Sequence, residues 1–239
     1  MTRDFIAAAA HQLQRLYNKC LPNPCFLCAA PAGDSSLCVA CQADLPRLTT
    51  GCLRCATPLS APGICGQCLQ KPPPQAQTFC LLPYLSPVDD LIGAYKFHQQ
   101  LGLRDFFAGQ MAARLQCRDD LPALILPVPL HNRRLRQRGY NQSADLANRL
   151  GQLLNIDVDN HTLKRIRATQ PQSELPFKER RKNLRGAFAC GDLNGIQHVA
   201  LIDDVYTTGH TVAEAGRCLQ KQGVARLEVW TIARAIRHD

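Results

Sequence analysis

A segment near the C-terminus combines acids, hydroxyls and a glycine in an order suited to binding chemistry. Residues 203–211 follow an apolar run, 199–202, that predicts a buried strand, and they precede a predicted helix. In parallel α/β sheets, ligands bind beyond the carboxyl ends of the strands, so this segment is a candidate ligand-binding loop. Its members are Asp203, Asp204, Val205, Tyr206, Thr207, Thr208, Gly209, His210 and Thr211.

The two ends of this loop suit different parts of one ligand. Gly209 lets the backbone approach a ligand closely, and threonine hydroxyls with successive amides at a helix N-terminus favour a phosphate. The carboxylates of Asp203 and Asp204 instead accept hydrogen bonds from vicinal hydroxyls, as on ribose. The loop therefore predicts a ligand that contains ribose 5-phosphate. The alternative is a pair of strand-end acids that holds Mg²⁺ or a hydrogen-bond network ahead of an ordinary N-capped helix.

Four Cys-x-x-Cys pairs in the N-terminal third predict metal binding. Thiolates two residues apart can hold one tetrahedral ion, and the spacing of the first two pairs recurs in the last two. We expect two tandem zinc ribbons, each with four cysteine ligands and a structural Zn²⁺. The spacing also allows a cross-braced pairing, first pair with third and second with fourth. The ligands are Cys25, Cys28, Cys38, Cys41, Cys52, Cys55, Cys65 and Cys68.

Two basic segments account for the formal net charge of +9. Residues 131–138 hold four arginines and no acid, and residues 164–185 hold eight Lys or Arg against two Glu. Such local concentration suits a polyanionic ligand. Solvated surface is the alternative for both segments.

The remaining pattern alternates strands with helices. Strands are expected at 123–128, 199–202 and 227–232, and alternation of this kind favours a doubly wound, mainly parallel sheet. Ser86 and Asp89 resemble an N-cap and capping box that open a helix. The other helices are expected at 103–115, at 141–154, and from the end of the candidate loop to near Gly223.

No apolar run approaches the roughly 20 residues that a membrane span needs. The apolar stretch at the start of the chain is short and is expected to be an amphipathic helix, which favours a cytoplasmic protein.

Four parts of the chain are expected from these signals. The parts are an N-terminal helix at 1–19, tandem zinc ribbons at 20–70, a Pro-rich linker at 71–80 and an α/β domain at 81–239.

Two resemblances extend this interpretation. Residues 201–211 resemble the loop of type I phosphoribosyltransferases that binds phosphoribosyl diphosphate (PRPP), with Tyr206 as one unusually bulky member. Further blocks, together with the cysteine pairs ahead of a Pro-rich stretch, resemble the ComF/GntX family of competence-type proteins over about residues 20–235. The blocks are residues 127–130, 133–142, 165–170 and 181–188.

The resemblance implies a type I phosphoribosyltransferase fold with a site for PRPP and Mg²⁺. Asp203 and Asp204 would be the catalytic pair and would hold the ribose hydroxyls. The loop after the first core strand, with nearby arginines, would bind the diphosphate, and residues 166–182 would form a flap over it. The PRPP-binding residues would be Asp203, Asp204, Val205, Thr207, Thr208, Gly209, His210 and Thr211. The diphosphate and flap residues would be Val128, Pro129, Leu130, Arg133, Arg136, Arg138 and Arg167.

Three functions are compatible with these residues. The first is a ComF-type accessory of DNA uptake that binds PRPP and single-stranded DNA, with proteins of the uptake machinery as further partners. The second is an active phosphoribosyltransferase that acts on an unidentified acceptor. The third is a PRPP-sensing scaffold without catalysis.

Overall fold

The computed structural model describes residues 23–97, 100–167 and 184–236. The predicted N-terminal helix, and nearly all of the predicted flap, lie outside these residues. The chain forms one five-stranded sheet in which every neighbouring pair is parallel, with the order β1-β7-β6-β2-β3. The strands are β1 (Gln77–Pro83), β2 (Leu124–Pro127), β3 (Asp157–Val158), β6 (His198–Tyr206) and β7 (Arg226–Arg234). The predicted parallel α/β architecture is confirmed.

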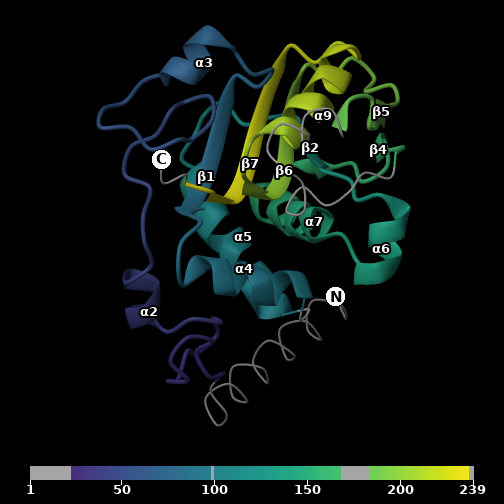
Figure 1. Ribbon diagram of the computed structural model, residues 1–239. Helices are drawn as coiled ribbons and strands as arrows, with labels where there is room; N and C mark the ends of the chain where they lie inside the picture. Colours follow the sequence, from purple (N-terminus) through teal and green to yellow (C-terminus); the bar gives the residue numbers. More distant parts are fainter. Residues whose placement is uncertain (1–22, 98–99, 168–183, 237–239) are drawn as a thin grey trace.

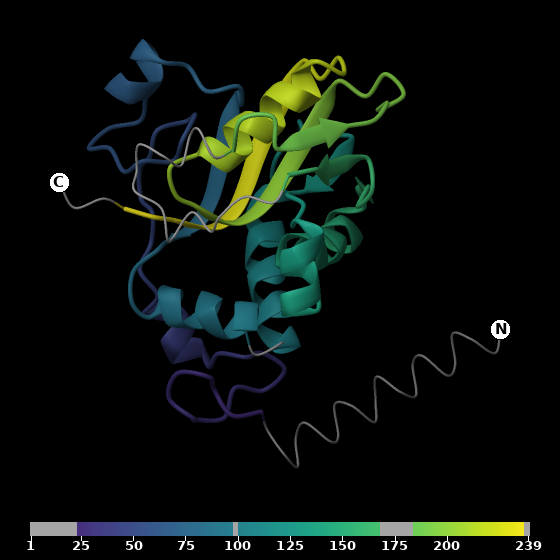
Figure 2. The ribbon, with the colours of Figure 1, turned by 45° about the vertical axis from the view of Figure 1, so that its right-hand side comes forward.

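Helices cover both faces of this sheet (Figures 1 and 2). One face carries α4 (Val88–Phe97), α5 (Leu101–Leu115) and α7 (Gln142–Leu154). The other face carries α9 (His210–Gln220) and a small antiparallel pair, β4 (Leu163–Arg165) with β5 (Phe188–Cys190). Alternate residues of β6 enter the two cores, which is why residues 199–202 of this strand are all apolar.

Several elements differ from the sequence prediction. Strand β6 continues to Tyr206, so Asp203 and Asp204 lie within the C-terminal part of the strand and not in a loop after it. Helix α4 begins at Val88, after Pro87, so the predicted cap at Ser86 is wrong. Strand β1 was not predicted, and it begins at Gln77, inside the segment assigned to the linker. A short helix, α6 (Asn132–Arg138), was also not predicted.

The two zinc ribbons join different cores; in Figure 1 the helix of the second ribbon, α3, lies at the upper left, and the helix of the first, α2, lies at the lower left, below α4. The first contains α2 (Val39–Ala43), and its Leu37 and Leu45 join the core that contains residues of α4 and α5. The second contains α3 (Gly66–Gln70), and it shares the core beneath α9. The backbone N–H of Thr78 in β1 donates to the carbonyl of Leu53, at 2.8 Å, which attaches the second ribbon to the sheet edge. The two repeats, adjacent in sequence, therefore pack against different cores of the α/β domain.

Across the described parts of the chain, we find no helix with the length and apolar character needed to cross a membrane.

Candidate functional site

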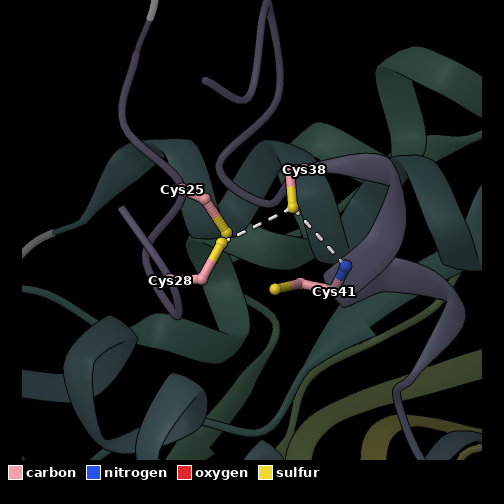
Figure 3. Close-up of side chains that lie close together, drawn as sticks. All are labelled: Cys25, Cys28, Cys38 and Cys41. Carbon is pink, nitrogen blue, oxygen red and sulfur yellow. Dashed lines mark hydrogen bonds between the residues drawn. The ribbon is translucent and has the colours of Figure 1, made fainter. Parts of the chain in front are cut away.

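The eight paired cysteines form two separate clusters of four. Within each cluster the sulfur atoms all lie within 4.8 Å of one another. The Sγ atoms of Cys28 and Cys38 are 3.7 Å apart, as are those of Cys55 and Cys65. This separation matches the edge of a tetrahedron whose centre is about 2.3 Å from each sulfur, the usual zinc–thiolate distance. The clusters are Cys25, Cys28, Cys38, Cys41 (Figure 3) and Cys52, Cys55, Cys65, Cys68.

This grouping decides between the two pairings that the spacing allowed. Neighbouring pairs share a site, and the cross-braced alternative is wrong. One thiol of each cluster is poised to ionise. Burial opposes ionisation of Cys25 and Cys52, but backbone N–H groups lower the pKa of Cys25 to about 6 and that of Cys52 to about 7. A thiolate is the form that binds zinc, so both sites suit a structural Zn²⁺.

The acids at the end of β6 are held by helices from the α4–α7 face. Ser143, in the first turn of α7, donates from Oγ to Asp203 Oδ1 at 3.2 Å, and the backbone N–H of Asp204 donates to the same oxygen at 3.0 Å. Lys96, in the last turn of α4, forms an ion pair with Asp204, with Nζ 2.9 Å from Oδ2. Neither Ser143 nor Lys96 was recognised from the sequence, because nothing in a single helix indicates which strand end it will reach.

The two neighbouring acids carry different electrostatic loads. Burial and, after it, the charge of Asp204 raise the pKa of Asp203 to about 7, although the Asp204 amide, Lys96 and Ser143 act in the opposite direction. Lys96 and Asp204 are both mostly buried, with side-chain exposures of 19% and 16%. The site therefore holds one carboxylate that is paired with a cation and one that is close to its protonation point near neutral pH.

The loop between β6 and α9 has the conformation that a phosphate cradle needs. Gly209 precedes α9 with φ of +74°, in the left-handed region, and a Cβ there would collide with the hydroxyl of Tyr206. As the N-cap of α9, Gly209 offers no side chain to the first turn, while Thr208 Oγ1 accepts from the His210 amide at 3.4 Å. Helix starts of this kind bind phosphate through their amides.

A cavity of about 350 Å³ adjoins this loop on the side of the second ribbon. Thr208, Gly209 and His210 form one wall, and Cys68 with the Pro-rich segment 72–74 forms another. Its volume falls within the range of small-molecule pockets.

The predicted diphosphate loop lies beside the acid pair. It follows β2, the neighbour of β6, and the Val128 amide donates to the carbonyl of Ile202 at 2.8 Å. Asn141 Nδ2 donates to the Val128 carbonyl at 3.1 Å, which fixes the start of the loop. Val128 is buried, whereas Pro129 and Leu130 are partly exposed. The structure thus brings residues 128–130 next to the strand end that carries Asp203.

The four predicted basic residues differ in exposure, and three of them are exposed. Arg133 and Arg136 of α6 are exposed. Arg138 is partly buried and donates to Gln142 Oε1 at 3.2 Å. Arg167 is exposed and donates to the carbonyl of Arg185 at 2.6 Å. None of these four has a described hydrogen bond or ion pair to Asp203 or Asp204.

Arg165, which was not among the predicted diphosphate residues, interacts electrostatically with Asp203. Burial lowers the pKa of Arg165, the charge of Arg134 lowers it further, and Asp203 raises it. Arg165 therefore interacts electrostatically with both Arg134 and Asp203. Arg165 stands at the end of β4, with Cζ 5.7 Å from the centre of the Phe188 ring.

Comparison with known proteins identifies the family. The model of the double zinc ribbon domain matches residues 16–69. The DNA utilization protein YhgH of Salmonella typhimurium is 34% identical over 229 residues, which cover 90% of this chain and 99% of that protein. Competence protein F of Haemophilus influenzae is 34% identical and covers 84% of this chain and 91% of its own. The chain belongs to the ComF/GntX family.

More distant similarities accompany this ComF/GntX assignment. Competence protein ComFC of Bacillus subtilis is 24% identical, over 80% of this chain and 81% of that protein. Among solved structures, the purine phosphoribosyltransferase of Pyrococcus horikoshii is similar with a TM-score of 0.35 and 16% identity, over 57% of this chain and 85% of that chain.

Proposed function

We propose that this ComF/GntX protein is a competence-type accessory of DNA uptake that binds PRPP at the carboxyl edge of its sheet and also binds single-stranded DNA. The observation that carries the PRPP half is the arrangement at the end of β6. Two partly buried acids, a glycine-capped helix start and the loop after β2 lie side by side there. Few ligands combine vicinal hydroxyls, a phosphate and a second anionic group in that order.

Each part of PRPP has a matching set of groups. The ribose hydroxyls would donate to Asp203 and Asp204. The 5-phosphate would accept hydrogen bonds from the amides and hydroxyls of residues 207–211. The diphosphate would lie over residues 128–130, close to the positive charge of Arg165.

Mg²⁺ fits this site only as a companion of the ligand. Asp204 is already paired with Lys96, and the groups of metal-ligating side chains found among the described residues are the two cysteine clusters. Mg²⁺ keeps several waters and binds substrate phosphates readily, so the diphosphate would supply most of the ligands other than water. When bound, it would neutralise part of the diphosphate charge.

The DNA half of the proposal is supported by surface chemistry and by relatives. The proteins at 34% identity are named for DNA utilization and for competence. Arg133 and Arg136 project from α6 without burial, as phosphate-contacting arginines do. We propose single-stranded DNA as the polyanion that meets this face and a role beside proteins of the DNA-uptake machinery.

Phosphoribosyl transfer is the second candidate, and the position of Arg165 favours it. A partly buried guanidinium that interacts electrostatically with Asp203 can stabilise a departing diphosphate. In that reaction the bond from the anomeric carbon to the diphosphate oxygen breaks, and the acceptor donates an electron pair to the same carbon and loses a proton. A PRPP sensor without catalysis is the outcome in which binding is found and neither transfer nor DNA binding is.

The test is a thermal shift of the zinc-loaded full chain with PRPP and Mg²⁺. We expect PRPP to raise Tm, and the Asp203→Ala/Asp204→Ala double variant to lose the shift. No stabilisation of the native chain by PRPP would refute the proposal. Salt-dependent binding of single-stranded DNA, weakened in Arg133→Ala/Arg136→Ala, tests the DNA half. Release of diphosphate with a panel of bases tests transfer.

A further inference from the structure

Tyr206, the bulky member of the loop, is buried beneath it. Its hydroxyl accepts a hydrogen bond from Gln75 Nε2 at 3.0 Å, and the same hydroxyl lies against Gly209. Gln75 comes from the Pro-rich segment before β1, 131 residues away in the chain. A residue of the N-terminal half, Gln75, therefore supports the tyrosine that packs against the phosphate loop.

Gln75 in turn holds the backbone of the second zinc ribbon. Its Nε2 donates to the carbonyl of Arg54 at 2.9 Å, and Thr78 Oγ1 donates to the same carbonyl at 2.6 Å. Arg54 lies between the first two ligands of the second cluster, Cys52 and Cys55. One amide group thus connects the zinc knuckle with the hydroxyl of Tyr206.

Arg234 forms a second connection between the same two parts. From the end of β7, its Nη1 donates to the carbonyls of Tyr206 and Thr207, at 3.0 and 2.6 Å. Its Nη2 donates to Thr57 Oγ1 at 2.9 Å, and that hydroxyl is 3.2 Å from Cys55 Sγ. The guanidinium also lies 4.9 Å from the centre of the Tyr206 ring. The backbone that turns into the phosphate loop is fixed by a cation anchored on the ribbon.

The first ribbon makes different contacts. Its core residues belong to the core that contains α4 and α5, whereas α9 belongs to the other core. Ser36 of this ribbon lies against Gly102 of α5. The two clusters have the same sequence spacing, so the first ribbon is a built-in control for the second.

We propose that the second zinc centre fixes the phosphate loop, and that Gln75, Tyr206 and Arg234 are the positioning residues through which it acts. Zinc bound to the second cluster holds the Arg54 carbonyl and Thr57 in place. The Arg54 carbonyl positions Gln75 and through it Tyr206, and Thr57 positions Arg234, which binds the carbonyls of Tyr206 and Thr207. Loss of this ion releases the loop, whereas loss of the first ion does not. The inference rests on the proposed PRPP site.

Matched cysteine variants test the proposal. Cys65→Ala in the second cluster and Cys38→Ala in the first each remove the third ligand, and both positions are partly buried. Zinc content should fall from two ions to one in each. We expect Cys65→Ala to bind PRPP at least tenfold more weakly and to exchange amide hydrogens faster in residues 203–211. Cys38→Ala should bind PRPP within about twofold of the native chain. Equal losses in both variants, or no loss in Cys65→Ala, would overturn the proposal.

A variant that leaves both metal sites intact covers the case in which Cys65→Ala fails to fold. Tyr206→Phe removes the hydrogen bond to Gln75 and keeps the ring. Loss of one such bond weakens an equilibrium about three- to tenfold, so PRPP affinity should fall by that factor with two zinc ions still bound. Gln75→Ala should produce little additional loss in the Tyr206→Phe background, whereas additive losses would contradict a shared path.

Failure of the PRPP assignment has a separate signature. If the native chain does not bind PRPP, the proposed function is wrong, but exchange in residues 203–211 still reports on the zinc connection. If the native chain binds PRPP and neither Cys65→Ala nor Tyr206→Phe affects it, only the zinc connection is wrong.

Discussion

Asp203→Asn should make the protein more stable and less able to bind PRPP. Burial raises the pKa of Asp203 to about 7 from an ordinary value of 3.8, so ionisation of this side chain costs the folded state free energy. At about 1.4 kcal/mol for each pKa step, the cost is at most about 4 kcal/mol above pH 7. Asparagine keeps an oxygen for the hydrogen bonds from Ser143 and the Asp204 amide and carries no charge.

We expect a gain of about 2 kcal/mol at pH 8, because burial of the amide cancels part of the benefit. For a chain of this size, that corresponds to a rise in Tm of about 4–8 °C. The sign of the pH dependence follows from the raised pKa. Between about pH 4 and pH 7 the folded state holds a proton that the unfolded state has lost, so the stability of the native protein decreases across this interval. The gain should therefore be small near pH 4 and largest above pH 7.

The assay is thermal unfolding of the zinc-loaded protein from pH 5 to pH 8, with Asp119→Asn, an exposed acid, as the control. Asp119→Asn should change Tm little at any pH. PRPP affinity of Asp203→Asn should fall at least tenfold, since a ribose-binding carboxylate is lost. A stability gain that does not vary with pH, or a loss of stability at pH 8, would refute the electrostatic reasoning.

Three further substitutions have defined outcomes. Glu228 is fully buried and accepts hydrogen bonds from Arg118 at 2.7 Å; breaking this pair with Glu228→Gln should destabilise the fold by about 3–5 kcal/mol, measured by urea unfolding. Burial raises the pKa of Glu228, but the hydrogen bonds from Arg118 more than offset it and hold this pKa below its usual range. The contribution of the pair to the free energy of unfolding should therefore be present at neutral pH and lost in acid. Lys96→Met removes a charge that lowers the pKa of Asp203, so the pH at which PRPP binding reaches half its maximum should rise; an unchanged pH profile would argue against contact of Lys96 with the site. Gly209→Ala places a Cβ at positive φ against Tyr206, and should cost about 1–3 kcal/mol and weaken PRPP binding, as scanned by calorimetry.

The sequence predicted those features whose signal is local. The apolar run before Asp203 and the glycine after the threonines required no knowledge of distant residues, and both lie where expected. The cysteine spacing predicted two zinc sites, although only the structure showed that neighbouring pairs share each site.

The features that were missed depend on partners far apart in the chain. The prolines before β1 were interpreted as a linker that continued to residue 80, and the pairing partner that makes residues 77–83 a strand, β7, is far away in the chain. Lys96 reaches Asp204 only because α4 follows that edge strand. Arg134 is partly buried whereas Arg133 and Arg136 of the same short helix are exposed, and Arg165 reaches Asp203 from β4; counting charges along the sequence reveals neither. Tyr206 looked like a bulky exception, and its role became clear only with Gln75 beneath it.

The pairing of β1 with β7 has a consequence for biosynthesis. Cys80 and Thr231 face each other across these strands and are 151 residues apart. At about 5–20 residues per second, a ribosome needs roughly 8–30 s to make the intervening chain. All eight zinc ligands emerge before that interval begins, so metal capture can precede completion of the sheet. During the wait β1 has no strand to pair with, and the nascent chain carries an open edge that metal-loaded ribbons on either side can shield from other chains.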